Sequence, residues 1–196
     1  MPDQSVHMIR LRSAMRRQRA GLTPAQIQDA SARIAHHLWS LTAIARAGRI
    51  AGYVAVGGEV DCAAFLAQAT ARGRKTYLPV IHGETLVFAP AQAPERMVSN
   101  RFGIPEPGPD AGPCLRGRDL DVVLTPLVAY DDHGHRLGMG GGFYDRSFAF
   151  LRHRGRWRRP LLVGIAYRFQ RVESIAVHDW DVSLHAVVNE CGASFF

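Results

Sequence analysis

The chain has 196 residues, of which 47% are hydrophobic, so it is long enough for one well-buried core, and we expect a single domain over residues 1–196. It has neither an apolar run near the roughly 20 residues that span a bilayer nor a signal-peptide core, so we exclude a membrane partner and expect a cytoplasmic protein. The net charge is +7, and only Lys75 among the 24 basic residues is not arginine, which favours anionic ligands.

Two helices are expected before the first strand. Residues from about Met8 to Ala20 have helical character, and Leu22-Thr23-Pro24 then gives a stop and an N-cap with proline at the first helical position. The helix that follows has apolar residues at three- and four-residue steps, which predicts one buried stripe: Ile27, Ala30, Ile34, Leu38 and Leu41.

The next segment alternates between strand and helix patterns. Arg49 to Val56 is predicted to be a strand, with Gly57-Gly58 as a turn. Asp61 is predicted to be the N-cap of a helix that ends near Gly73. Thr76 to Ile81 is expected to form the next strand, which gives a strand-helix-strand unit.

A long loop and a second such unit follow. Residues from about Ala89 to Asp119 are rich in Pro and Gly and predict a loop, either functional or a simple surface excursion. A strand at 121–128, a glycine-rich segment, a helix from Phe143 to Leu151 and a strand from Leu161 to Ala166 then complete the pattern. We therefore predict an α/β fold: a three-layer, Rossmann-like domain with a mostly parallel central sheet and helices on both faces. Because ligands collect at the carboxyl ends of such strands, Glu59 and the glycine-rich segment are expected to face one crevice.

The segment from Arg136 to Asp145 indicates a binding site. It reads Arg-Leu-Gly-Met-Gly-Gly-Gly-Phe-Tyr-Asp and lies between a strand and a helix N-terminus, where exposed amides and the helix dipole favour a phosphate. Asp145 would lie in the first turn of the helix, able to hold a metal beside that phosphate. The segment matches neither the P-loop nor the dinucleotide fingerprint, so a tight turn in which Asp145 only complements the dipole is the alternative.

Arginines are concentrated in two clusters, Arg10 to Arg19 and Arg152 to Arg159, the second interrupted by Trp157. Basic residues beside an aromatic can bind nucleic acid, so an RNA-binding protein is one alternative function. Solvated helix faces are the simpler explanation of the clusters, and no recognised nucleic-acid module accompanies them, so nucleic acid is not the partner we favour.

Ordered motifs recur along the chain. The most specific runs from Pro126 to Arg146, where a strand, an Asp-x-x-Gly turn, Arg-Leu-Gly, the glycines and Phe-Tyr-Asp-Arg follow one another. Supporting segments are Leu11-Arg12, Gly57 to Asp61, Phe102 to Pro107, Val163 to Ala166 and Ala186 to Glu190. In this order the motifs resemble the 5-formyltetrahydrofolate cyclo-ligase family over nearly the whole chain.

The resemblance implies a cytoplasmic ligase of folate and one-carbon metabolism. It would use ATP, with Mg²⁺, to convert 5-formyltetrahydrofolate to 5,10-methenyltetrahydrofolate, releasing ADP and phosphate. The substrate would be a reduced folate, with Arg152 to Arg159 attracting the polyglutamate tail of its cellular forms, and we expect a monomer. The alternative within the family is a relative that binds nucleotide or folate with weak or no ligase activity.

The resemblance also implies roles for individual residues. Arg136, Tyr144 and Asp145 would be catalytic. Those that bind ATP would be Arg12, Arg136, Leu137, Gly138, Met139, Gly140, Gly141, Gly142, Phe143 and Tyr144. Val54, Glu59, Phe102 and Tyr144 would bind the folate, with Glu59 accepting hydrogen bonds from the pterin. Asp145 and Asp181 would bind the metal, with Asp179 as a competitor for the second position.

The chain departs from the family pattern at four positions. Met8 and Gly141 stand where lysines are common, Trp180 where histidine is common, and His185 where aspartate is common. Losing a lysine beside a triphosphate weakens nucleotide binding unless another cation substitutes, and Arg10 or Arg146 would be the substitute.

Overall fold

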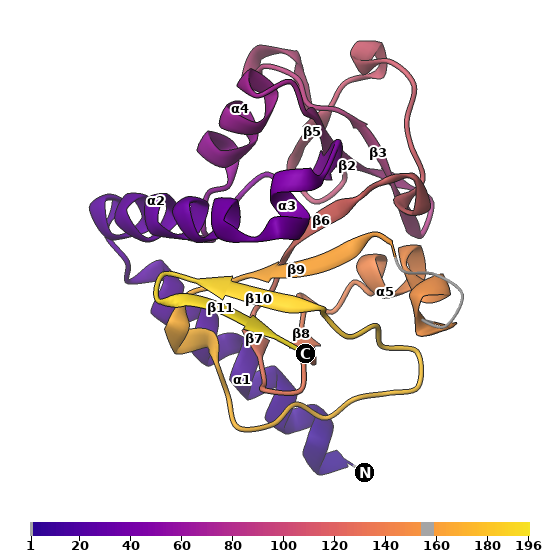
Figure 1. The fold of residues 1–196 in the computed structure, drawn as a ribbon. Coiled ribbons are helices and arrows are strands. Elements are labelled where there is room, and N and C mark those ends of the chain that lie inside the picture. The colour runs from indigo at the N-terminus through magenta and orange to yellow at the C-terminus, as the bar shows by residue number, and fades with distance from the viewer. Residues whose placement is uncertain (1, 154–158) are drawn as a thin grey trace.

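A central mixed sheet organises the chain. The computed structural model describes residues 2–153 and 159–196, within which a seven-stranded sheet has the order β11-β10-β9-β6-β1-β2-β3 (Figure 1). Strands from β10 to β2 in this order run parallel, whereas the edge strands β11 and β3 are antiparallel to their neighbours. This confirms the predicted α/β fold with a mostly parallel sheet. The strands of this sheet are β1 (Arg49–Ala51), β2 (Lys75–His82), β3 (Thr85–Pro90), β6 (Val122–Pro126), β9 (Leu161–Ile165), β10 (Ala186–Asn189) and β11 (Gly192–Phe195).

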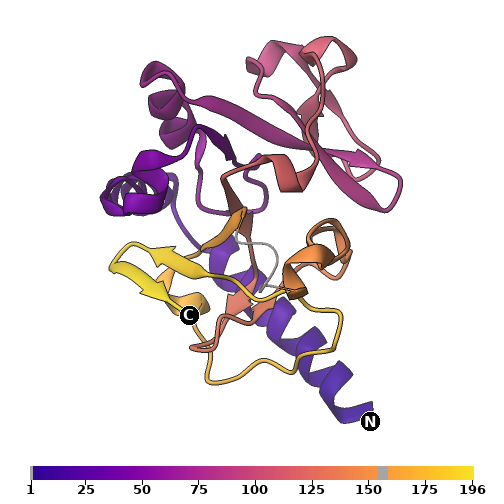
Figure 2. The ribbon, with the colours of Figure 1, turned by 45° about the vertical axis from the view of Figure 1, so that its right-hand side comes forward.

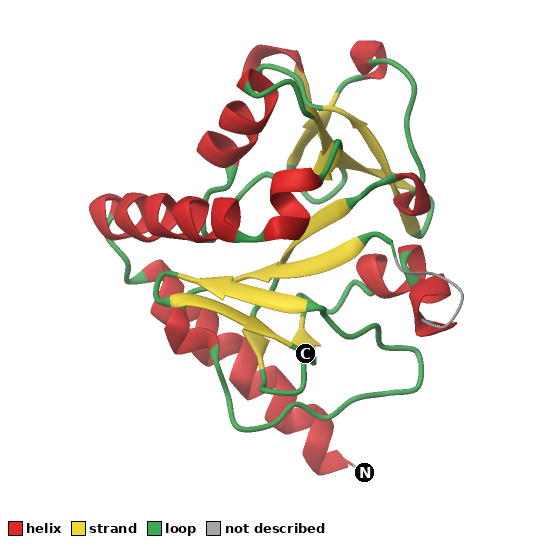
Figure 3. Cartoon of the chain, in the orientation of Figure 1, coloured by secondary structure: helices red, strands yellow, loops and turns green. Residues whose placement is uncertain are grey.

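Helices cover both faces of this sheet (Figure 3). Neighbouring strand residues point to opposite faces: Ile50 packs in a cluster with α2, α3 and α4, while Ala51 packs in a second cluster with Phe148 and Leu151. Burial on both faces explains why the inner strands are continuously apolar in sequence. The helices are α1 (Pro2–Ala20), α2 (Pro24–Ser40), α3 (Thr42–Arg46), α4 (Ala63–Ala71) and α5 (Phe143–Ser147).

The start of α2 forms as predicted. Thr23 is the N-cap, and its side chain and that of Gln26 form a reciprocal capping box around Pro24 at the first helical position. Of the predicted stripe, Ala30, Ile34 and Leu38 are buried, while Ile27 and Leu41 are half-buried. One apolar face of α2 therefore packs against the sheet.

Helix α1 begins at Pro2, earlier than the predicted Met8, and it crosses the molecule away from the other long helices (Figure 2). It packs on a separate two-stranded ribbon formed by β7 (Ala129–Tyr130) and β8 (Arg136–Leu137). The contact is apolar and joins Met8, Leu11 and Met15 to Val128, Ala129, Leu137 and Ile175. One side of this basic helix is thus fixed against the chain.

The predicted strand from Arg49 to Val56 was too long, because β1 ends at Ala51. The chain then leaves the sheet in a loop that the Tyr53 hydroxyl closes by donating to the Val60 carbonyl at 2.8 Å. Gly57 and Gly58 have φ of +57° and +76°, which confirms the predicted turn.

The N-cap of α4 is Cys62, not the predicted Asp61. Asp61 still acts from one position earlier, because its carboxylate accepts the Ala63 amide hydrogen at 2.9 Å. The helix ends before Gly73, which has φ of +75°, as expected for a residue that stops a helix.

The predicted loop from Ala89 to Asp119 contains regular structure. Its first residues belong to β3, and β4 (Met97–Ser99) pairs antiparallel with β5 (Pro105–Pro107). The prolines that argued against a strand are tolerated because a two-stranded ribbon leaves one edge of each strand unpaired. Short 3-10 turns occupy Pro94–Arg96, Pro109–Ala111 and Gly117–Asp119.

The predicted helix from Phe143 to Leu151 is interrupted. Helix α5 ends at Ser147, and a 3-10 turn over Ala149–His153 follows. Another 3-10 turn covers Arg168–Gln170. In the described part of the chain, no helix is both long enough and apolar enough to span a bilayer.

Candidate active site

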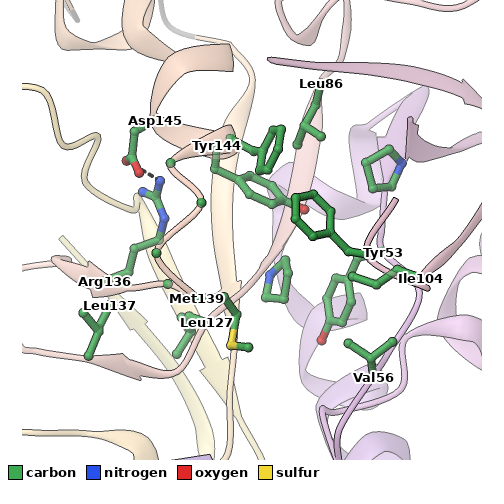
Figure 4. A pocket seen from close by; sticks show the side chains of 18 of the residues that line it. Tyr53, Val56, Leu86, Ile104, Leu127, Arg136, Leu137, Met139, Tyr144 and Asp145 are labelled. Atoms are coloured by element: carbon green, nitrogen blue, oxygen red, sulfur yellow. Dashed lines mark hydrogen bonds and ion pairs between the residues drawn. The ribbon is translucent and has the colours of Figure 1, made fainter. Parts of the chain in front are cut away.

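One large cavity opens where the parallel strands end. Its volume is about 1140 Å³, and residues that follow β1 and β6 line it, among them Tyr53 and Leu127. All of the site residues taken from the family resemblance also line it: Arg12, Val54, Glu59, Phe102, Arg136, Leu137, Gly138, Met139, Gly140, Gly141, Gly142, Phe143, Tyr144, Asp145 and Asp181. Figure 4 shows Arg136 and Asp145 at one end, with Tyr53 and Val56 at the other.

The glycine segment forms one wall of the cavity. Gly140 and Gly142 have φ of +95° and +64°, so two of the glycines are needed for the backbone path itself. Gly138 is different, because its φ is not in the left-handed region and a Cβ atom built there meets nothing within 4 Å. The Gly138 carbonyl accepts a hydrogen bond from Arg12 Nε at 2.9 Å, which joins α1 to the segment.

Arg136 and Asp145 form an ion pair beside the glycines. Arg136 Nη2 lies 2.5 Å from Asp145 Oδ1, and the two side chains are 6% and 25% exposed. Arg136 also donates to the Val182 carbonyl, and the Val182 amide donates to Asp145 Oδ1 at 3.1 Å. The pair therefore fastens β8, α5 and the segment before β10 to one another.

Asp181 shares a small hollow with this pair. Asp145, Arg136 and Asp181 all line it, and Asp181 Oδ2 accepts the His178 amide hydrogen at 2.8 Å. Among the described residues, no group of three His, Cys, Asp or Glu side chains has the arrangement of a metal site. Two carboxylates fit Mg²⁺, which binds through one or two carboxylates together with phosphate oxygens and water.

A second buried ion pair lies at the other end of the cavity. Arg19 Nη1 is 3.2 Å from Glu59 Oε1, and the two side chains are 3% and 9% exposed. The Val56 amide donates to Glu59 Oε2 at 3.2 Å. Burial raises the pKa of Glu59, and Arg19 and the Val56 hydrogen bond oppose that rise.

Aromatic side chains line the space between the two ion pairs. The hydroxyl of Tyr144 is enclosed and has no hydrogen-bond partner among the described residues, and burial raises its pKa. Phe102, at the turn between β4 and β5, is 58% exposed and packs edge-on against Phe143 with ring centroids 5.8 Å apart. An exposed ring and an unpaired buried hydroxyl are both available to a flat, polar ligand.

Helix α1 contributes more to the cavity than the sequence indicated. Met8, Arg12, Arg16 and Arg19 line it, at steps of three and four residues. Arg16 and Arg19 were not predicted as site residues, although their spacing from Arg12 is the signal that places them on its face. Arg10, suggested as a substitute for the missing lysine, is not among the lining residues.

Arg146, the other suggested substitute for a lysine, and the departures Trp180 and His185 occupy different places. Arg146 lines the cavity, but its guanidinium donates to the carbonyls of Glu84 and Gly141, both at 2.7 Å. Trp180 also lines it, 60% exposed and stacked on His178 with ring centroids 4.5 Å apart. His185 is not a lining residue, and its Nδ1 accepts the Leu162 amide hydrogen at 3.0 Å.

Asp179, the competitor for the second metal position, is not among the lining residues, and its carbonyl accepts from Arg152 at 3.1 Å. Arg152 itself lines the cavity, whereas Arg159 is paired with Asp121 at 2.6 Å. The rest of the second arginine cluster, residues 154–158, lies outside the described residues.

Known proteins are similar to this chain in sequence and in fold. The model of the 5-formyltetrahydrofolate cyclo-ligase family matches residues 4–190. This chain belongs to the 5-formyltetrahydrofolate cyclo-ligase family. It is 37% identical to the Escherichia coli K12 5-formyltetrahydrofolate cyclo-ligase over 177 residues, covering 89% of this chain and 95% of that protein.

Two further relatives support membership of the cyclo-ligase family. The Haemophilus influenzae 5-formyltetrahydrofolate cyclo-ligase is 36% identical over 183 residues, which cover 91% of this chain and 95% of that protein. The solved structure of Aquifex aeolicus 5,10-methenyltetrahydrofolate synthetase matches with a TM-score of 0.80 at 27% identity, covering 96% of this chain and 92% of that one. The resemblance stated from the motifs is therefore confirmed.

Proposed function

We propose that this cytoplasmic, single-domain protein converts 5-formyltetrahydrofolate to 5,10-methenyltetrahydrofolate, using ATP and releasing ADP and phosphate. One observation carries the proposal. In a chain of the cyclo-ligase family, a single cavity combines a glycine wall beside Arg136 and Asp145 with a second region that holds Glu59 among aromatic residues. Such a cavity can hold a triphosphate and a pterin together.

The chemistry requires activation of a poor leaving group. The formamide oxygen attacks the terminal phosphorus of ATP, the bond to ADP breaks, and an imidate phosphate forms. The second folate nitrogen then attacks the formyl carbon and gives up its proton, and the carbon-oxygen bond breaks as inorganic phosphate leaves. The protein contributes mainly positioning and charge stabilisation.

The residues at the Arg136 end would hold the nucleotide. Arg12, Arg136 and the amides from Gly138 to Tyr144 would bind the phosphates, with the aliphatic parts of Leu137 and Met139 beside them. Asp145 and Asp181 would hold Mg²⁺, which supplies charge neutralisation of the phosphates. The two carboxylates bordering one hollow support this assignment.

The residues at the Glu59 end would hold the folate. Glu59 would accept hydrogen bonds from the pterin, and Val54 and Phe102 would pack against its faces. Tyr144 lines the cavity and interacts electrostatically with both Glu59 and Arg136, so we assign it to both ligands. The Tyr144 hydroxyl is enclosed and has no hydrogen-bond partner among the described residues, which supports a hydrogen bond from it to the substrate.

The proposal is tested by turnover. Purified protein with Mg²⁺ and ATP is expected to produce the absorbing methenyl product from 5-formyltetrahydrofolate, with one ADP per product. Omission of ATP should abolish the product. Folate binding without any ATP-dependent product, by protein shown to be folded, would instead identify a binding relative, and salt-dependent RNA binding would favour the RNA-binding alternative.

The second arginine cluster, of which Arg152 lines the cavity, suggests a preference among folates. We propose that the cluster from Arg152 to Arg159 attracts polyglutamate tails, since Arg152 lines the cavity and is exposed. Changing the arginines of this cluster to glutamate is expected to raise KM for polyglutamylated substrate about tenfold, and KM for monoglutamate much less. The same change at Arg33, an exposed α2 residue, is the control, and equal effects on both substrates would refute the assignment.

A further inference from the structure

Arg19 is a buried arginine that has no assigned role in the proposed reaction. Its side chain is 3% exposed, although arginine is seldom buried without a compensating partner. Arg19 Nη1 lies 3.2 Å from Glu59 Oε1 and 3.5 Å from the Leu127 carbonyl oxygen. Arg19 Nε has no hydrogen-bond partner among the described residues. The guanidinium is therefore held inside the protein mainly by Glu59.

Hydrogen bonds and a close backbone approach hold the framework around this pair. The Gln170 side chain donates to the Leu127 carbonyl at 2.9 Å, and the Tyr167 hydroxyl donates to the Gly58 carbonyl at 3.1 Å. A Cβ atom at Gly58 would lie 2.8 Å from the Arg19 carbonyl oxygen, so α1 approaches the turn before Glu59 closely. Arg19 is thus fixed by α1 while Glu59 is fixed by the turn after β1.

Arg19 is the positive charge that interacts with Glu59 among the described residues, and four further ionisable groups there interact with it electrostatically. Tyr53 and Cys62 lie on its own segment, Tyr144 faces it from α5, and Tyr167 from the segment after β9. Burial raises the pKa of each of these groups, so all four are neutral near pH 7. Arg19 supplies the positive charge that favours the ionised form of Glu59.

The protonation state of Glu59 matters for what it can bind. A pterin ring presents two adjacent donors, its ring N–H and its amino group, to a partner in the ring plane. An ionised carboxylate offers two acceptors and matches both donors, whereas a protonated carboxyl turns one acceptor into a donor. Loss of ionisation would therefore replace one hydrogen bond with a donor-donor contact.

We infer that Arg19 is a positioning residue that keeps Glu59 ionised and oriented for the two donors of the pterin. This inference rests on the proposed function and adds to it a residue that is absent from the motifs used above. Arg19 acts through Glu59, so its contribution should disappear when Glu59 can no longer ionise.

A double-mutant cycle tests the inference. The variants are Arg19→Met, Glu59→Gln and the double variant, with kcat and KM measured for both substrates. Arg19→Met is expected to raise the folate KM about tenfold, with little change in kcat or in the ATP KM. The double variant should match Glu59→Gln alone, because without an ionisable group at position 59 the arginine has nothing to act on.

The pH profile separates this role from a merely structural one. In Arg19→Met, Glu59 lacks the counter-charge that opposes the effect of burial, so its pKa should rise further than in wild type. The excess in folate KM over wild type should therefore grow as pH falls and shrink as pH rises. Arg19→Lys should restore most of the affinity. Arg17→Met is the matched control, since Arg17 is exposed on α1 and its side chain donates a hydrogen bond to Ser13 on the same helix.

The outcomes are distinct. A folate KM in Arg19→Met that does not vary with pH, or effects that simply add in the double variant, would overturn the inference. If Arg19→Met does not fold, the folate KM is compared between wild type, Arg19→Lys and the double variant instead. The double variant should fold because it removes both buried charges. The same cycle can be run on the affinity for 5-formyltetrahydrofolate, measured by calorimetry without turnover. If wild type binds folate but does not turn it over, the proposed function is refuted, while the inference about Arg19 can still be tested.

Discussion

Replacing Asp145 with asparagine is expected to lower kcat about a thousandfold while leaving the protein folded. The asparagine carbonyl oxygen can still accept from Arg136 and from the Val182 amide, so the contacts that fasten α5 survive. The negative charge is lost, and with it the ligand we assign to Mg²⁺ and the counter-charge that orients Arg136. Turnover, together with calorimetric titration of Mg²⁺ and ATP, measures the effect.

Asp132→Asn is the matched control for Asp145→Asn. Asp132 is also paired with an arginine, Arg171, but it is 56% exposed and is not among the cavity-lining residues, so activity should be unchanged. Asp181→Asn compared with Asp179→Asn then identifies the second metal carboxylate, and we expect the larger loss at Asp181. Full activity in Asp145→Asn would contradict both the metal assignment and the catalytic role of the ion pair.

Gly138→Ala is expected to raise the KM for ATP about a hundredfold with no loss of thermal stability. The added methyl group meets no atom within 4 Å in the protein and demands no unusual φ, so the structure itself accepts it. It would project where we place the phosphates, and a phosphate chain displaced by a methyl group no longer lies in line for transfer. Steady-state kinetics and a thermal melt give the two readouts.

Gly21→Ala provides the control for Gly138→Ala. Its Cβ atom would make ordinary contacts at 3.5 and 3.7 Å at the end of α1, and its φ is also outside the left-handed region. We expect neither stability nor the ATP KM to change much in that variant. An unchanged ATP KM in Gly138→Ala would mean that the nucleotide lies elsewhere.

The sequence predicted β6 and β9 most closely because each is a continuous apolar run buried on both faces, as at Val122–Pro126, whereas it extended β1 too far and did not predict β10 as a strand. The N-cap at Thr23 was also predicted correctly, since its hydrogen bonds join residues close together in the sequence. The antiparallel edge strands and the β4–β5 ribbon were missed because their pairing depends on tertiary contact and their prolines argued against it.

The site shows the same division between local and distant information. The glycine segment and Glu59 were found from their own sequence context. Arg16 and Arg19 were missed because their roles depend on where α1 lies relative to the sheet, and α1 is too polar for its pattern to reveal a buried face. Its hydrogen bond from Arg12 to Gly138 joins residues 126 positions apart.

That separation has a consequence for the order of events during translation. Helix α1 is synthesised before the ribbon on which it packs, and the glycine carbonyl that Arg12 contacts is made more than a hundred residues later. A nascent chain therefore has no complete pocket until the stretch that carries Asp181 has emerged, and its first apolar stripe stays uncovered until then. A polypeptide released early would leave that stripe exposed to solvent, because the residues that cover it would be missing.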